Sequence, residues 1–127
     1  MTSFASPYAR LLGLTRAVEH DRLIVTMPFG DGVLGRPGFL HGGAMAGLLD
    51  YAGWATLLEA LGEGDRIKPI AVSVDFLRGG KLVDTYAAAE IVRLGRRIAN
   101  VVATAWQEDE AKPIARADMK FLIERRG

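Results

Sequence analysis

The sequence predicts an α+β fold in which a curved antiparallel sheet wraps around one long central helix. Residues 41–61 form an apolar stretch without proline that is far longer than a strand, so we expect a helix buried on nearly every side. Four strand-like segments follow, and consecutive strands joined by short turns favour antiparallel pairing. Because one face of one sheet cannot bury every side of such a helix, the pattern also predicts a curled sheet and a partner subunit.

Each element of this fold has its own signal. Residues 3–13 predict a short helix, since Ser6-Pro7 provides an N-cap followed by a first-turn proline. Residues 16–19 and 23–28 predict a hairpin, and the glycines of residues 29–40 predict a loop. After the central helix we expect a four-stranded meander, whose last strand alternates apolar and charged residues most clearly. The four strands are assigned to residues 67–77, 84–94, 98–107 and 114–123.

Composition limits the classes of function. With 127 residues, half of them apolar, the chain suits a single domain over residues 1–127. A net charge of +1 gives no case for nucleic-acid or membrane-surface binding. The absence of cysteine, with His20 and His41 as the only histidines, argues against disulfides, thiol nucleophiles and a multi-histidine metal site. The N-terminus does not resemble a signal peptide, and Asp50 and Glu59 interrupt the apolar helix, so we expect a cytoplasmic protein without a membrane span.

Asp50 is the most informative residue because it lies inside the apolar helix. A buried carboxylate without a basic partner is rare, and no Lys or Arg lies within one helical turn of Asp50. Mostly small residues one turn away leave room for a ligand or a partner chain. The helix opens with His41-Gly42-Gly43, whose backbone N–H groups would face an approaching group. A carboxylate in a dry site near a helix N-terminus is typical of acyl transfer or hydrolysis.

Three motifs, in this order and at these separations, make the chain resemble a known family. They are Gly38-Phe39-Leu40-His41-Gly42-Gly43 followed by Asp50, then Val72-Ser73-Val74-Asp75-Phe76-Leu77-Arg78, then Val92-Arg93-Leu94-Gly95-Arg96. Together they resemble the hotdog-fold acyl-CoA thioesterases, and the branch they are most similar to is the phenylacetate-pathway type. The match covers most of the chain.

The resemblance implies hydrolysis of acyl-CoA thioesters at a site on a dimer interface, with coenzyme A as part of the substrate and no other cofactor. Carried over by position, Asp50 is the general base or the nucleophile, and the Gly42 N–H polarises the thioester carbonyl. Ser73 helps to hold the attacking water, and His41 is a positioning residue. One departure concerns the asparagine that many relatives carry six residues before the histidine, because this chain has Gly35 there. We therefore expect water positioning, activity or substrate preference to differ.

Further residues are candidates for substrate binding. Arginine suits the phosphates of coenzyme A, whereas solvated arginine beside a turn is the ordinary alternative. Aromatic residues of the motif regions could line an acyl pocket, with core packing as their alternative. The candidates are Gly43, Arg78, Arg96, Arg97, Phe39 and Trp54.

The catalytic candidates have structural alternatives as well. Gly42 and Gly43 could serve close packing of the helix, His41 could be an N-terminal cap, and Ser73 could be an ordinary strand residue. By alternation, Ser73 shares a strand face with Asp75, opposite Val72 and Val74.

Two other functions and the assembly remain open from the sequence. A non-catalytic acyl-CoA-binding module is compatible with Gly35. A hotdog enoyl-CoA hydratase is less well matched, because that chemistry pairs an Asp with a His a few residues later and no His follows Asp50. We expect an obligate homodimer with sites shared between chains, paired again into a homotetramer.

Overall fold

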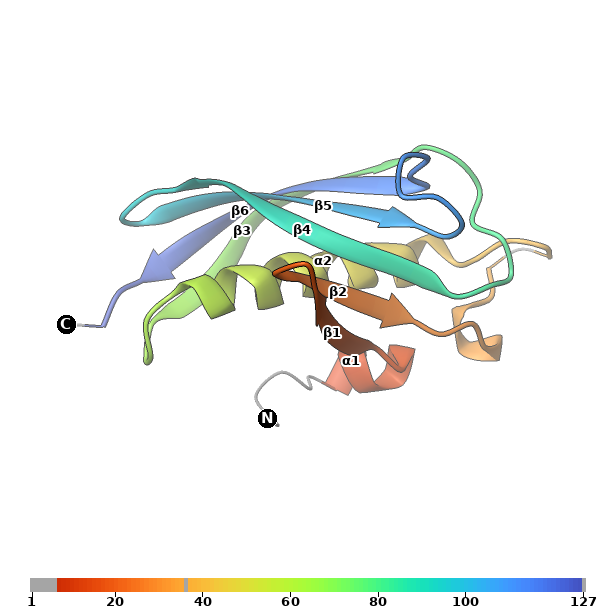
Figure 1. Ribbon diagram of the computed structural model, residues 1–127, viewed down its shortest axis with the longest axis horizontal. Coiled ribbons are helices and arrows are strands. Elements are labelled where there is room, and N and C mark those ends of the chain that lie inside the picture. The colour runs from red at the N-terminus through yellow and green to blue at the C-terminus, as the bar shows by residue number, and fades with distance from the viewer. Residues whose placement is uncertain (1–6, 36, 127) are drawn as a thin grey trace.

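A six-stranded antiparallel sheet curves around one long helix (Figure 1). The structure is a computed structural model that describes residues 7–35 and 37–126. The strand order is β1-β2-β4-β5-β6-β3, and every pairing is antiparallel. The elements are α1 (Pro7–Leu12), β1 (Thr15–Glu19), β2 (Arg22–Met27), a 3₁₀ turn (Asp31–Val33), α2 (Gly42–Ala60), β3 (Arg66–Phe76), β4 (Thr85–Leu94), β5 (Ile98–Trp106) and β6 (Ala115–Glu124).

The predicted elements are present, with ends that shift by one residue in most cases. The predicted hairpin is β1 and β2, joined at His20 and Asp21, whose φ angles of 53° and 62° suit a tight two-residue turn. The predicted N-terminal helix is α1, and residues 3–6 of that prediction lie outside the described residues. In β6 the odd-numbered residues are buried and most even-numbered ones are exposed, so the predicted alternation is confirmed.

The predicted four-stranded meander is wrong in one connection. β3 does not pair with β4 but crosses to the far edge of the sheet and pairs with β6, while β4 lies between β2 and β5. The connection over residues 77–84 is held against the far strands, because the N–H groups of Leu77 and Arg78 donate to the Ile114 carbonyl (2.8 and 3.2 Å). The Lys81 N–H donates to the Gln107 side chain at 2.9 Å. These contacts hold the connection across the end of the sheet. A short hairpin turn at this point would instead have paired β3 with β4.

α2 is buried against the sheet on one side and only partly covered, by α1, on the other. Leu48, Leu49 and Ala52 are fully buried and form the centre of the core with the inner face of the sheet. The expectation of a helix buried all round is therefore wrong for a single chain. One stripe remains open or half-buried, and its members are Gly43, Ala46, Gly47, Asp50, Tyr51, Trp54 and Leu58. Apart from Asp50 these residues are small or apolar, so their composition does not distinguish this side of the helix from the buried one.

β3 is an edge strand with unusually exposed apolar side chains. Its inner face packs partly on the core through Ile67 and Val74. Val72 and Phe76 are 48% and 53% exposed, and the edge away from β6 has no partner strand in residues 7–35 and 37–126. A long exposed edge strand of this kind is a template for pairing with another chain.

No helix within the described ranges is both long and apolar enough to span a bilayer.

Candidate active site

Asp50 lies at a cavity between α2 and the N-terminal segment. The cavity has a volume of about 230 Å³. Its lining residues are Tyr8, Ala9, Leu14, Gly47, Asp50, Tyr51 and Trp54. The rings of Tyr51 and Trp54 lie 5.8 Å apart at a 40° tilt. Asp50 is the only carboxylate in a lining that is otherwise mostly apolar and aromatic.

The environment of Asp50 favours its protonated form. In one chain Asp50 is exposed, so the expectation of a fully buried carboxylate is corrected: α1 packs over Gly43 and Gly47 of the open stripe but leaves Asp50 exposed. Partial burial against the neighbouring atoms still raises the pKa of Asp50 above its ordinary value. No ion pair or hydrogen bond of this carboxylate occurs within the described part of the chain, so no neighbouring charge offsets the desolvation.

The N-terminus of α2 is capped by His41. The Gly43 N–H donates to His41 Nδ1 at 3.0 Å, so the imidazole is an N-cap. A Cβ at position 43 would lie 2.8 Å from the His41 ring, and a side chain there would displace the cap. The geometry of the cap therefore explains why position 43 is a glycine. The Gly43 N–H already donates to the His41 side chain.

The Gly42 N–H is left available by this arrangement. It has no acceptor among residues 7–35 and 37–126 and belongs to the first helical residue, where backbone N–H groups and the helix dipole favour negative charge. Gly42 lines a groove at the start of α2, together with His41, Phe39 and Arg78 among other residues. A Cβ at Gly42 would meet Phe76 at 3.4 Å, so packing alone does not require glycine there.

The two candidate groups, Asp50 and the Gly42 N–H, therefore lie in separate places on one chain, and we call these places half-sites. Gly42 and Asp50 are eight residues apart on the same helix, which places them about 12 Å apart along its axis. The Asp50 cavity and the Gly42 groove share no lining residue. In an attack geometry, the oxygen of a carboxylate-activated water lies only about 3–3.5 Å from the carbonyl carbon that it attacks. The two groups of a single chain are therefore poorly placed for one reaction centre.

Gly35 cannot easily be replaced by a larger residue. A Cβ at this position would lie 3.0 Å from His41 Cα and 3.1 Å from the Leu40 carbonyl oxygen. The Gly35 N–H donates to the Phe39 carbonyl at 2.9 Å, and the His41 N–H donates to Val33 at 2.7 Å. The loop before α2 is thus closed tightly on itself, and it presents no side chain at position 35 to orient water.

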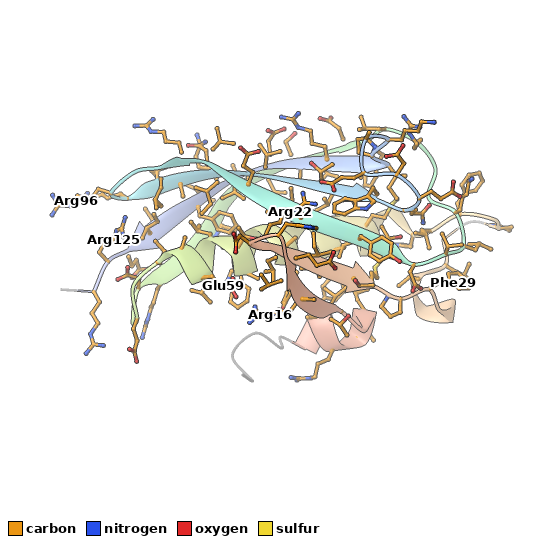
Figure 2. All side chains as sticks on the ribbon, in the orientation of Figure 1. Arg16, Arg22, Phe29, Glu59, Arg96 and Arg125 are labelled. Atoms are coloured by element: carbon orange, nitrogen blue, oxygen red, sulfur yellow. The ribbon has the colours of Figure 1, made fainter. Side chains whose placement is uncertain are left out.

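Of the remaining predicted residues, Ser73, Arg96 and Arg97 lie apart from both half-sites. Ser73 is exposed, and its register partner Asp118 is an exposed residue on the face of β6 opposite the core, which agrees with the alternation predicted for it. Within one chain Ser73 therefore does not approach Asp50. Arg96 and Arg97 border a hollow beside β6, and Figure 2 shows Arg96 at the end of the molecule opposite Phe29. Arg78 alone of the three arginines lies near the Gly42 groove.

Tyr8 and Leu14 line the Asp50 cavity and were missed by the sequence interpretation. They precede the recognised motifs and carry no spacing signal of their own. Their place depends on how α1 packs on α2, which the sequence does not specify. Trp54, in contrast, was a candidate for an acyl pocket from the sequence, and it lines this cavity.

The fold and these half-sites define a class of protein, and comparison with known proteins identifies the family. The model of the Thioesterase superfamily matches residues 37–114, which is more than half of the chain. The chain belongs to this superfamily, and its curved sheet around α2 is the hotdog fold. Membership supports thioester hydrolysis as the general activity. No curated protein matches the chain in sequence.

Several solved structures share this fold. A Chromobacterium violaceum protein is 33% identical, with a TM-score of 0.79 and coverage of 93% of this chain and 83% of the other. A putative thioesterase from Ralstonia eutropha, described as related to phenylacetic acid degradation, is 25% identical, with a TM-score of 0.81 and coverage of 92% and 90%. A Bacillus halodurans protein solved with CoA is 23% identical, with a TM-score of 0.87 and coverage of 97% and 82%.

Proposed function

We propose that this protein hydrolyses acyl-CoA thioesters in a homodimer, with Asp50 of one subunit and the Gly42 N–H of the other forming one site. The observation that carries the proposal is the pair of half-sites. A desolvated carboxylate lies in an apolar cavity, and an available helix-terminal N–H lies about 12 Å away along the same helix. Among the described residues, the Asp50 half-site has a carboxylate base but no oxyanion donor, and the Gly42 half-site has the donor but no carboxylate base.

The chemistry follows from these two groups. Asp50 accepts a proton from water as the water oxygen attacks the thioester carbon, and the carbonyl oxygen becomes an oxyanion. The Gly42 N–H and the dipole of α2 stabilise that negative charge. The intermediate then collapses, the carbon–sulfur bond breaks, and the proton returns to the leaving thiolate. The products are the free acid and coenzyme A.

Asp50 could instead attack the carbon directly. An acyl–Asp50 anhydride would form with release of the thiolate, and water would then hydrolyse it. A single turnover in ¹⁸O-labelled water tests for the anhydride. Label found in the Asp50 carboxyl supports the anhydride, because water has then attacked its Asp50 carbonyl. Label found only in the product acid is expected both from the general-base route and from water attack on the acyl carbon of the anhydride.

Two surfaces of the single chain support a second copy as the partner. The edge of β3 presents unpaired backbone and exposed apolar side chains. The open stripe of α2 contains Ala46, Trp54 and Leu58 around Asp50. Covering the stripe would remove water from the carboxylate and complete the burial that the sequence led us to expect. Pairing of two dimers into a tetramer belongs to the same proposal.

A substrate panel tests the proposed function. Wild-type protein and Asp50→Asn are incubated with acyl-CoAs of different acyl groups, and thiol release is followed. We expect turnover by the wild type and its near-complete loss in Asp50→Asn, with circular dichroism unchanged. Binding of acyl-CoA by calorimetry without any thiol release would contradict hydrolysis and favour the acyl-CoA-binding module, for which the lack of a side chain at Gly35 is the supporting observation.

A further inference from the structure

The cavity beside Asp50 is bordered on one side by α1, from which Tyr8, a residue 48% exposed in the single chain, lines it. The Tyr8 hydroxyl donates to the Gly43 carbonyl oxygen at 3.2 Å. Its ring lies directly over Gly47, since a Cβ built at Gly47 would be 2.4 Å from Tyr8 Cε2. Glycine at position 47 is what allows the ring to approach the helix so closely. Tyr8 thus lies along α2 between its N-terminus and Asp50.

α1 is fixed to the core. Ala9 and Leu12 are each only 5% exposed, and Leu12 belongs to the core cluster. The Leu14 N–H donates to the Ala9 carbonyl at 3.0 Å, which closes the end of the helix. Because these contacts anchor both sides of the segment, Tyr8 and Leu14 form a fixed wall of the cavity.

The opposite wall is aromatic and equally constrained. Tyr51 and Trp54 lie 5.8 Å apart on α2. Burial raises the pKa of the Tyr51 phenol, while the neighbouring Arg16 opposes that rise. Arg16 in turn lies 3.7 Å from Glu59, so the side of the cavity away from Tyr8 is held by a polar cluster.

The size of the cavity limits what it can hold. Its volume of about 230 Å³ is below the roughly 300–1,000 Å³ of sites that enclose a whole ligand. It therefore suits one part of a thioester, and its mostly apolar lining suits the acyl part more than the charged nucleotide handle. An acyl group whose carbonyl carbon lies at Asp50 would meet either the Tyr8 and Leu14 wall or the Tyr51 and Trp54 wall.

From this geometry we infer that Tyr8 is a specificity-determining residue whose ring sets the upper limit on the length of the acyl group. The inference rests on the proposed thioesterase function and deepens it. Short and compact acyl groups fit between Tyr8 and Trp54, and longer straight chains are excluded by the phenol ring. The Tyr8 hydroxyl positions the ring through Gly43 and takes no part in the chemistry.

Kinetics over a series of straight-chain acyl-CoAs, from acetyl to dodecanoyl, test this role. Tyr8→Ala opens the wall, and kcat/KM for long chains should rise relative to short chains by about fourfold for each further methylene that the opened cavity buries. Tyr8→Phe keeps the ring and should keep the wild-type chain-length limit. Leu11→Ala, at a 78% exposed position of the same helix, is the matched control and should also keep it.

The outcomes separate this inference from the proposed function. If the wild type hydrolyses thioesters but Tyr8→Ala has the chain-length profile of Leu11→Ala, the inference is overturned and the proposed function stands. If Tyr8→Phe shifts the profile as much as Tyr8→Ala, the hydroxyl and not the ring sets the limit, which also overturns it. Tyr8→Leu replaces Tyr8→Ala should the latter not fold, with the same expected direction of shift.

A binding series covers the case in which no hydrolysis occurs. Dissociation constants of the same acyl-CoAs are measured by calorimetry for the wild type and Tyr8→Ala. A shift in chain-length preference without turnover would support the wall and contradict the proposed function. The absence of both binding and turnover would overturn both.

Discussion

Asp50 combines a partly desolvated position with the absence of a basic partner among residues 7–35 and 37–126, and this combination has a measurable effect on stability. Because its pKa is higher in the folded protein than in the unfolded chain, the folded state binds more protons between these two values. The free energy of unfolding therefore falls as the pH rises through that window and stays reduced above it. Ionised Asp50 is a cost to the fold at neutral pH.

The Asp50→Asn variant should show this cost directly. Asparagine cannot ionise, so we expect an equal or higher free energy of unfolding than the wild type at pH 7, and a difference that vanishes near pH 3, below the usual aspartate pKa of about 3.9. Urea denaturation of both proteins at both pH values measures this difference.

In the wild type, kcat/KM should rise with pH through the raised pKa of Asp50. A variant with wild-type kcat and an unchanged melting temperature would contradict a catalytic role.

Replacing Gly42 by proline would remove one backbone N–H with little other change to α2. Proline is well tolerated at the first position of a helix, and His41 already has the extended backbone (φ −69°, ψ 129°) that precedes proline comfortably. Gly42→Pro should lower kcat by about 10²–10³ through loss of an oxyanion donor, while Gly42→Ala, which keeps the N–H, should lose far less. Steady-state kinetics with circular dichroism decide this. Equal losses in both variants would indicate a steric effect.

At the scale of elements, the sequence predicted those features of the fold that depend on interactions between residues close together in the chain. The ends of α2 lay within one residue of the prediction because His41-Gly42-Gly43 and the glycines after Leu61 mark them chemically. The crossing of β3 was not predictable in the same way. It depends on contacts of residues 77–84 with Ile114 and Gln107, which are remote in sequence. The open stripe of α2 escaped prediction because its residues are as apolar as those of the buried side.

The arginines belong to two different elements, and their roles can be tested separately. Arg78 follows β3 near the Gly42 groove, whereas Arg96 and Arg97 lie in the β4–β5 turn at the other end of the sheet. If they bind the phosphates of coenzyme A, alanine variants should raise KM more than they lower kcat, and high salt should shrink the difference. Lys120→Ala, an exposed residue of β6, controls for loss of charge.

A truncated thioester without the nucleotide provides the decisive comparison for these arginines. The effect of each Arg→Ala change should vanish on that substrate, because the phosphates are gone. Equal losses on the full and truncated substrates would mean that the arginine supports the fold. The placement of the residues predicts that Arg78 and the Arg96–Arg97 pair act on one ligand only if two subunits bring the two ends of the sheet together.

At the scale of the whole molecule, the proposed shared site makes assembly a condition of activity. The exposed edge of β3 and the open stripe of α2 favour an obligate dimer. Sedimentation at micromolar concentration should give a dimer or tetramer. A stable monomer that retains full turnover would contradict both the assembly and the shared site.

Mixing two inactive variants tests whether a site is shared. Asp50→Asn lacks the base and Gly42→Pro lacks the oxyanion donor, so each homodimer should be nearly inactive. In a mixed dimer, intact Asp50 from the Gly42→Pro subunit faces intact Gly42 from the Asp50→Asn subunit, and one complete site is restored. Random reassociation makes half of the dimers mixed, which predicts recovery of about a quarter of wild-type activity.

The same experiment excludes the alternative arrangement. If Asp50 and Gly42 of one chain acted together, every site in a mixed dimer would still contain one defective group, and no activity would return. The two proteins are therefore unfolded together in urea, refolded at equal concentrations and assayed beside each variant refolded alone. Recovery should increase with the mixed fraction, reach its maximum at a one-to-one ratio, and be absent when the variants are mixed without unfolding and do not exchange subunits.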